Sequence, residues 1–289
     1  MGRFADTRAM LRDLGLAWQP GERVVAGLEA ALGVRRLEEI CIGCGVTQSN
    51  TDVPAQIRDV LAGAGIEYAV HDVGDPVVPR HHGPQIFYCN HPFGIADALI
   101  ALELALARRP DTKVLANKTL SAFDLNTDCI IWVDPFAGAA GNRTNQRGLR
   151  EALKHLHAGG SLLMFPAGIC SHLQLSKGRI TDPVWSQHLS RFMAGSGASA
   201  VPVCFNGHNS WTFQVLGLVH PMLRTIVLLR EFIGLKGHRI EVRVGPAVPE
   251  TQLVHAEEID GRTRQLREIL YTLPRTNVGP AARPTPMET

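Results

Sequence analysis

Short apolar segments alternate with longer stretches of helical periodicity along most of the chain. The apolar segments, typical of buried strands, cover 67–70, 85–90, 113–117, 129–134, 161–166, 200–205 and 239–245. Between most of them apolar residues recur every three or four positions, as in amphipathic helices, over 97–109, 145–157, 211–217, 221–234 and 256–273. Strands that are apolar almost throughout and alternate with helices predict an α/β fold, with a largely parallel central sheet flanked by helices.

The two ends of the chain have a different pattern. Residues 23–33 and 53–65 carry apolar residues at helical spacing and end near glycine, where helices commonly stop. We therefore predict a helical N-terminal cap over 1–65, packed on an α/β domain over 66–274, because no linker-like segment separates the two. Residues 275–289 are polar and rich in proline, which predicts a disordered tail.

Composition limits the partners and the location of the protein. Lysine and arginine number 29 and aspartate and glutamate 27, so no overall positive field favours nucleic acid. No segment reaches the roughly 18 to 20 uncharged apolar residues that a membrane span needs, and the N-terminus lacks the apolar core of a secretory signal. We expect a cytoplasmic protein whose contact with the inner face of a membrane is peripheral. Residues 215–235, with Arg224 and Arg230 beside lipid phosphates, are the candidate surface, and an ordinary half-buried helix pair is the alternative.

The cysteines give little support for a metal or redox site. Six of them are scattered without the spacing of a disulfide framework, at 41, 44, 89, 129, 170 and 204. Cys41 and Cys44 form a CxxC motif that could bind zinc together with His81 and His82. A second CxxC is absent and adjacent histidines rarely point at one ion, so the better interpretation is reduced cysteine used as a small apolar residue. We predict no metal.

The segment "NHPFGIAD" (90–97) carries the clearest candidate chemistry. It follows an apolar strand and precedes a helix, and in parallel sheets ligands bind at this end of the strands. His91 could remove a proton near neutral pH, with Asp97 orienting its ring and Gly94 permitting a tight turn. The alternative is a loop histidine beside an aspartate that only caps the helix, and spacing alone favours this alternative.

Other loops supply no nucleophile of their own. A GxSxG elbow is absent, so a His/Asp pair without its own serine suggests that the nucleophile is a hydroxyl or amine of a substrate. The glycine-rich segment 138–142 lacks the lysine of a phosphate-binding P-loop. Arg143 follows it at the start of a predicted helix, where a guanidinium and free backbone N–H groups could hold an anionic headgroup; a solvated basic face is the alternative.

Four ordered segments resemble one family. "NHPFGIAD" is similar to the His/Asp block of the glycerolipid and lysophospholipid acyltransferases, "FPAG" (165–168) to their FPEG block, and "VPVCF" (201–205) to their late strand. With "ITDPVW" (180–185), the chain resembles the hemolysin-like, or ornithine-lipid, branch of this superfamily. His91 and Asp97 are separated by five residues, as in that branch, and not by four as in the wider superfamily.

The resemblance implies an acyltransferase with no bound cofactor. His91 and Asp97 would be catalytic, the acyl donor would be an acyl carrier protein or coenzyme A thioester, and the acceptor would be the hydroxyl or amine of a lipid, such as a lyso-aminolipid or lysophospholipid. The residues expected to contact substrate are Asn90, Arg143, Asn145, Phe165, Pro166 and Gly168. Ala167 replaces the glutamate of FPEG, which disfavours a glycerol-phosphate acceptor. Pro135 stands where many members carry an arginine, which makes Arg143 the expected anion contact.

Two other functions fit the same residues. Ile95 and Ala98 replace glycines of the branch, so the chain could be a lipid or acyl-chain carrier without catalytic activity. Alternatively, His91 could activate water, which would make the protein an acyl thioesterase. Release of thiol from an acyl thioester, with and without an acceptor, separates the three functions.

Overall fold

A seven-stranded mixed sheet forms the centre of the computed structural model, which describes residues 21–46, 52–74, 83–117, 128–133, 142–253 and 258–274. The strand order is β1-β9-β8-β2-β5-β3-β4, and neighbouring strands are parallel except for the antiparallel pair β8 and β9. The strands are β1 (Glu67–Asp72), β2 (Gln85–Cys89), β3 (Lys113–Asn117), β4 (Ile130–Val133), β5 (Ser161–Met164), β8 (Ser199–Phe205) and β9 (Arg239–Val244). The predicted α/β fold with a mostly parallel sheet is confirmed.

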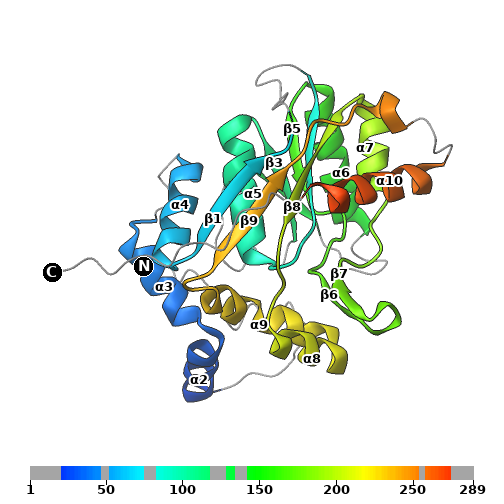
Figure 1. Cartoon of the computed structure of the whole chain (residues 1–289). Helices are drawn as coiled ribbons and strands as arrows, with labels where there is room; N and C mark the ends of the chain where they lie inside the picture. The colour runs from blue at the N-terminus through cyan, green and yellow to red at the C-terminus, as the bar shows by residue number, and fades with distance from the viewer. Residues whose placement is uncertain are drawn as a thin grey trace.

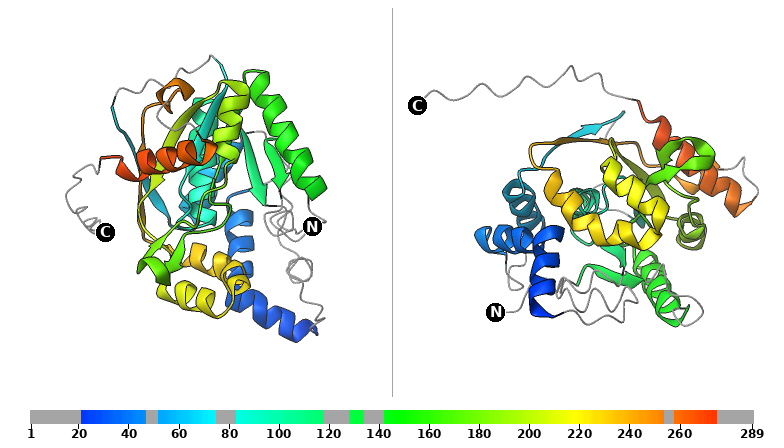
Figure 2. Two further views of the ribbon diagram at one scale, coloured as in Figure 1. Left: turned by 90° about the vertical axis from the view of Figure 1, so that its right-hand side faces the viewer. Right: turned by 90° about the horizontal axis from the view of Figure 1, so that it is seen from below.

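Helices cover both faces of this sheet (Figures 1 and 2). One face packs against α3, α4, α5 and α9, and the other against α6, α7 and α10. The helices are α2 (Glu22–Leu32), α3 (Val34–Gly43), α4 (Val53–Gly63), α5 (Ile95–Arg108), α6 (Asn142–His157), α7 (His188–Ser196), α8 (Trp211–Val219), α9 (Pro221–Gly234) and α10 (Ile259–Thr272), with 3-10 turns η3 (Leu175–Lys177) and η4 (Glu250–Leu253). The predicted tail over 275–289 lies outside the described residues.

All seven predicted strands form, but two smaller features were not predicted. A hairpin of β6 (His172–Gln174) and β7 (Arg179–Thr181) follows β5, and Figure 1 shows it beside α8. Helix α7 then returns the chain to the sheet before β8. Both hairpin strands have three residues, too few for alternation to be recognised in a sequence.

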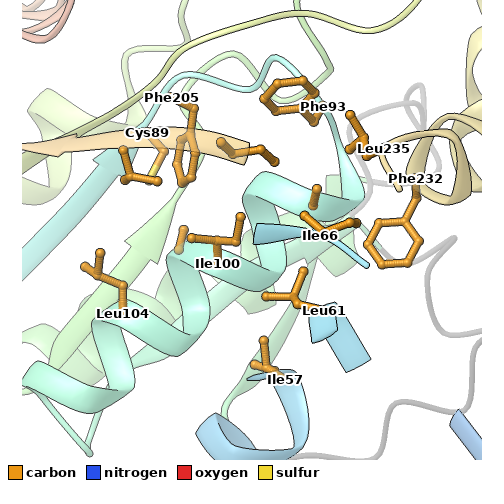
Figure 3. Close-up of a cluster of buried hydrophobic side chains, with 14 of the residues drawn as sticks. Ile57, Leu61, Ile66, Cys89, Phe93, Ile100, Leu104, Phe205, Phe232 and Leu235 are labelled. Carbon is orange, nitrogen blue, oxygen red and sulfur yellow. The ribbon is translucent and has the colours of Figure 1, made fainter. Parts of the chain in front are cut away.

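The side chains of strand β2 show why helices cover both faces of the sheet. Its five residues are all buried, and alternate side chains point to opposite faces. Phe87 and Cys89 join the apolar cluster under α5 and α9, part of which is shown in Figure 3. Ile86 and Tyr88 join the cluster under α7 and α10. A strand with two buried faces is rigid, so the loop that follows it starts from a fixed point.

The N-terminal helices share the core of the α/β body. Ile57 and Leu61 of α4 pack in the same cluster as residues of α5, as Figure 3 shows. Beside them the buried Glu103 of α5 accepts hydrogen bonds from Arg58 Nη1 (2.7 Å) and Tyr68 Oη (2.9 Å). This carboxylate therefore joins α4, α5 and β1, and it stays satisfied although it is buried.

Candidate active site

Three loops meet at the carboxyl ends of adjacent strands. Strand β2 lies between β5 and β8 and is parallel to both, so the loops that follow the three strands leave the same edge of the sheet. They begin at Asn90, Phe165 and Asn206. The sequence predicted the first two of these loops at the site. The glycine-rich segment 138–142, which precedes the expected anion contact Arg143, lies almost entirely outside the described residues.

His91 and Asp97 form the expected pair. Nδ1 of His91 lies 3.1 Å from Oδ1 of Asp97, and Oδ2 of Asp97 accepts a hydrogen bond from the backbone N–H of Phe93 at 2.8 Å. The Asp97 side chain is fully buried, while 15% of the His91 side chain is exposed. Asp97 thus both fixes the loop and orients the ring, so the two interpretations of the sequence were not exclusive. Because Asp97 engages Nδ1, it leaves Nε2 of the imidazole for a substrate.

Gly94 makes this geometry possible. Its φ of 84° and ψ of −76° suit glycine, which lacks a Cβ, and they let the loop turn directly into α5. A Cβ atom at this position would lie 2.7 Å from Cδ2 of Leu228 and 2.8 Å from Sγ of Cys170. Gly94 is therefore required for its backbone conformation and for the close approach of α9.

Asp182 holds the loop from the other side. Its Oδ1 accepts hydrogen bonds from the His91 backbone N–H (3.2 Å) and the Ser171 hydroxyl, and its Oδ2 accepts one from Trp185 Nε1 (2.9 Å). The side chain is fully buried. The His91 carbonyl in turn accepts a hydrogen bond from Ser171 N at 2.7 Å. One buried carboxylate thus connects the His91 loop to the segment after β5.

Asn90 has a positioning role. Its Nδ2 donates to the Phe205 carbonyl (2.9 Å) and its Oδ1 accepts from Phe205 N (2.8 Å), so the side chain pairs with the end of β8 as a strand backbone would. Only 4% of Asn90 is exposed. These two hydrogen bonds show that Asn90 fixes the start of the loop.

The segment after β5 places an aromatic ring on the histidine. The ring centroids of Phe165 and His91 are 4.3 Å apart, with an interplanar angle of 37°. Gly168, with φ of 70°, closes a turn by donating its N–H to the Phe165 carbonyl at 2.9 Å, and the Pro166 carbonyl accepts from Ser186 N. The structure therefore brings Phe165 into contact with His91, while Pro166 and Gly168 shape the turn beside it.

Cys170 is a neighbour of His91 that the sequence did not indicate. Burial by itself lowers the pKa of the imidazole, but negative charge on Asp97 and on Cys170, together with hydrogen bonds that the ring donates to them, more than offsets this. The net result is that the pKa of His91 lies well above its usual value of 6.5. Nothing in the sequence around Cys170 signals this contact, because the hairpin that places it was not predicted. Asp182 lies in the segment "ITDPVW", yet its role in holding His91 depends on tertiary contacts.

For several other residues that the sequence singled out, the described contacts show no interaction with this site. Asn145 lies in the first turns of α6, a helix that packs against β3, β4 and β5, and no described contact joins Asn145 to the His91 loop. The Arg143 side chain, Pro135, His81 and His82 lie outside the described residues. Among the described residues, no three His, Cys, Asp or Glu side chains gather as metal ligands, and none of the cysteines forms a disulfide. Cys44 instead donates a hydrogen bond to the Asp59 carbonyl at 3.1 Å.

A groove elsewhere on the molecule does not involve these loops. It has a volume of about 410 Å³ and lies between α4 and the β1 edge of the sheet. Its lining comprises Arg58, Leu61, Ala62, Ile66, Glu67, Tyr68 and Arg239. It contains no residue of the three loops that meet at His91.

None of the described helices has both the length and the apolar character needed to cross a membrane.

The comparisons with known proteins agree with the geometry. No curated protein matches the chain significantly. A family model described as acyltransferase matches residues 57–276, which is more than half of the chain and includes the His91 loop, the segment after β5 and Asp182. The chain belongs to this acyltransferase family.

Proposed function

We propose that the protein transfers a fatty acyl chain from an acyl thioester to a hydroxyl or amine of a lipid acceptor, with His91 as the general base. The observation that carries this proposal is the 3.1 Å contact between His91 Nδ1 and the fully buried Asp97, at the carboxyl end of β2. A carboxylate on Nδ1 fixes the tautomer in which Nε2 can accept a proton, and it stabilises the imidazolium that forms.

The reaction then has two proton transfers, both through His91. Nε2 removes the proton of the acceptor hydroxyl or amine as its oxygen or nitrogen attacks the thioester carbonyl. The tetrahedral intermediate collapses with cleavage of the C–S bond, and the leaving thiolate takes the proton back from the imidazolium. Because the pKa of His91 is raised, the ring is a strong base once it is neutral, and its reactive form increases as the pH rises.

The oxyanion of the intermediate needs hydrogen-bond donors close to His91. The N–H of Gly168 donates to the Phe165 carbonyl, so it is already engaged. The first turn of α5 begins at Ile95, whose own N–H donates to the Phe93 carbonyl at 3.2 Å. The N–H groups of the residues that follow it in this first turn lack partners within the helix. We therefore favour the start of α5 as the oxyanion site.

An acyl carrier protein or coenzyme A thioester is the proposed donor, and no other cofactor is needed for this chemistry. The hemolysin-like, or ornithine-lipid, branch remains our proposal for the finer class. It is supported by "NHPFGIAD", with Asp97 fully buried against His91, and by "ITDPVW", in which Asp182 and Trp185 support the His91 loop. A lyso-aminolipid or lysophospholipid is the corresponding acceptor.

Peripheral contact with the inner face of a membrane is part of this proposal. Helix α8 carries one exposed apolar stripe, in which Trp211 is 63% exposed, Val215 56%, Leu218 47% and Val219 74%. The last three residues follow Trp211 by four, seven and eight positions, so all four side chains share one face of the helix. The adjoining hairpin adds the exposed Leu175. An exposed apolar stripe suits the boundary between headgroups and acyl chains of a bilayer.

The charges around this stripe also suit an anionic lipid surface. Segments 172–181 and 207–236 together contain five lysine or arginine side chains and one acidic side chain, Glu231. The five are Lys177, Arg179, Arg224, Arg230 and Lys236. Glu231 accepts hydrogen bonds from Ser210, both from its backbone N–H and from its hydroxyl. The excess of positive charge would attract anionic headgroups.

The test is acyl transfer by His91→Ala, with His157→Ala on the exposed face of α6 as the matched control. Thiol release from an acyl thioester is followed with and without lysophospholipid and lyso-aminolipid acceptors. We expect wild-type and His157→Ala proteins to form acylated lipid, and His91→Ala to lose about 100-fold or more of this activity while a cooperative thermal unfolding transition shows that it is still folded. Full transfer by His91→Ala would contradict the proposal. Thiol release that does not depend on an acceptor would identify a thioesterase, and bound acyl chain without turnover would identify a carrier.

A further inference from the structure

Arg224 lies on the face of α9 that points toward the His91 site. Leu228, one helical turn later on the same face, contacts the position where a Gly94 side chain would be, as does Cys170. The Cδ of Arg224 lies 2.4 Å from the position of a Cβ on Gly217, so the arginine stem passes directly over the backbone of α8. Arg224 interacts electrostatically with both Cys170 and His172, which places its charge beside the segment that contacts His91.

Among the described residues, no carboxylate pairs with Arg224. Within the described part of the chain its guanidinium makes no ion pair and no hydrogen bond. The nearest acids in this region are already used, since Asp182 binds three donors and Glu231 binds Ser210. Burial lowers the pKa of Arg224, and Arg224 adds to the effect of burial in lowering the pKa of His172.

A partly buried guanidinium without an anion is unfavourable in the free protein. Its position in the first turn of α9 adds to the cost, because the positive end of the helix dipole repels a cation. Arg230 offers a contrast on the same helix, since it is exposed to solvent. The two arginines of α9 that the sequence grouped together as lipid contacts therefore have different surroundings.

We propose that Arg224 is a substrate-binding residue, which receives a phosphate group of a substrate next to His91. The planar fork of an arginine can make two parallel hydrogen bonds to a phosphate, and a phosphate would neutralise the charge that the protein leaves unpaired. This inference rests on the proposed acyl transfer. It assigns the contact with the anionic group to Arg224 of α9 and not to Arg143 of α6. The phosphate could belong to the pantetheine arm of the acyl donor or to the headgroup of the acceptor.

Binding of paired ligands distinguishes these sources without requiring turnover. One pair is 4′-phosphopantetheine and pantetheine, and the other is short-chain lysophosphatidic acid and the corresponding monoacylglycerol. Members of each pair differ only in the phosphate. Calorimetry with wild-type protein, Arg224→Gln and the control Arg264→Gln, at an exposed position of α10, gives the affinity that the phosphate adds, and thermal unfolding confirms that each variant is folded.

We expect wild-type protein and Arg264→Gln to bind the phosphorylated member of one pair about 10 to 100-fold more tightly, as charge-assisted hydrogen bonds would give. Arg224→Gln should lose this preference, and Arg224→Lys should keep part of it. Preference within the first pair assigns the phosphate to the donor, and within the second pair to the acceptor. The inference is wrong if wild-type protein shows no preference in either pair, or if Arg224→Gln retains it. Because no step depends on catalysis, this failure is distinct from retained activity in His91→Ala.

Discussion

Replacing Asp97 by asparagine tests the coupling between the buried carboxylate and His91. The change keeps the size of the side chain but removes its charge. Asp97 accepts two hydrogen bonds, from the His91 ring at 3.1 Å and from Phe93 N at 2.8 Å, and an amide has only one oxygen with which to accept them. Hydrogen bonds that involve a charged group each contribute about 1.5 to 3 kcal/mol. Because Asp97 is fully buried, solvent does not screen this loss.

The pKa of His91 gives the sign of the pH dependence. Its pKa in the folded protein is raised above that of the unfolded chain, so protonation of His91 stabilises the fold fully below pH 6.5 and this contribution is lost as the pH rises through the folded pKa. In Asp97→Asn the largest raising contribution disappears. The variant should therefore lose more stability at pH 6 than at a pH above the folded pKa of His91.

Two measurements check this prediction. Urea unfolding at both pH values should show the larger loss at pH 6. The pH profile of kcat/KM should rise in wild-type protein with a midpoint above 6.5, whereas in Asp97→Asn the midpoint should move to lower pH and the plateau should fall about 100 to 10,000-fold. If the variant keeps kcat/KM within about tenfold of wild type and its midpoint does not move, Asp97 does not act on His91 as we infer.

Three further changes test the support of the site and its surface. Asp182→Asn should lower stability by about 2 to 4 kcal/mol, since a buried acceptor of three hydrogen bonds is compromised; urea unfolding that matches wild type would contradict this. Gly94→Ala should lower both stability and kcat/KM because of its φ of 84° and the clash with Leu228, and the additional change Leu228→Ala should restore part of the loss; no effect of the first change would refute the steric reasoning. Trp211→Ser with Val219→Ser should weaken sedimentation with anionic vesicles and leave transfer to a detergent-dispersed acceptor unchanged; unaltered sedimentation would exclude this surface of α8.

The strands could be predicted because their signal is local. Strand 85–89 is buried on both faces, so its residues after Gln85 form a continuous apolar run that can be recognised. The position of His91 at its end follows from the rules of parallel sheets. The pairing of His91 with Asp97 could also be predicted, because both residues belong to one turn and the first turn of the next helix.

The remainder of the site depends on contacts between distant segments. Asp182 reaches the His91 backbone across 91 residues, and Cys170 is placed by a hairpin whose strands have three residues each. Asn90 was expected to contact substrate, but its pairing with Phe205 across 115 residues gives it a positioning role that no local pattern reveals. Arg224 was expected at a membrane surface because the periodicity of a helix does not tell which neighbour its faces meet.

Helix α10 determines how late in synthesis the active site can become complete. Arg267 of α10 donates hydrogen bonds to the carbonyls of Asp182 (2.8 Å) and Pro183 (3.0 Å), and its guanidinium lies 5.8 Å from the centroid of the Trp185 ring. The segment that holds His91 is thus itself held by a helix that is synthesised well after it. A nascent chain that has completed β2 and α5 already contains His91 and Asp97, but their loop gains its full support only after residue 267 has emerged. Acyl transfer should therefore begin only after α10 has been synthesised.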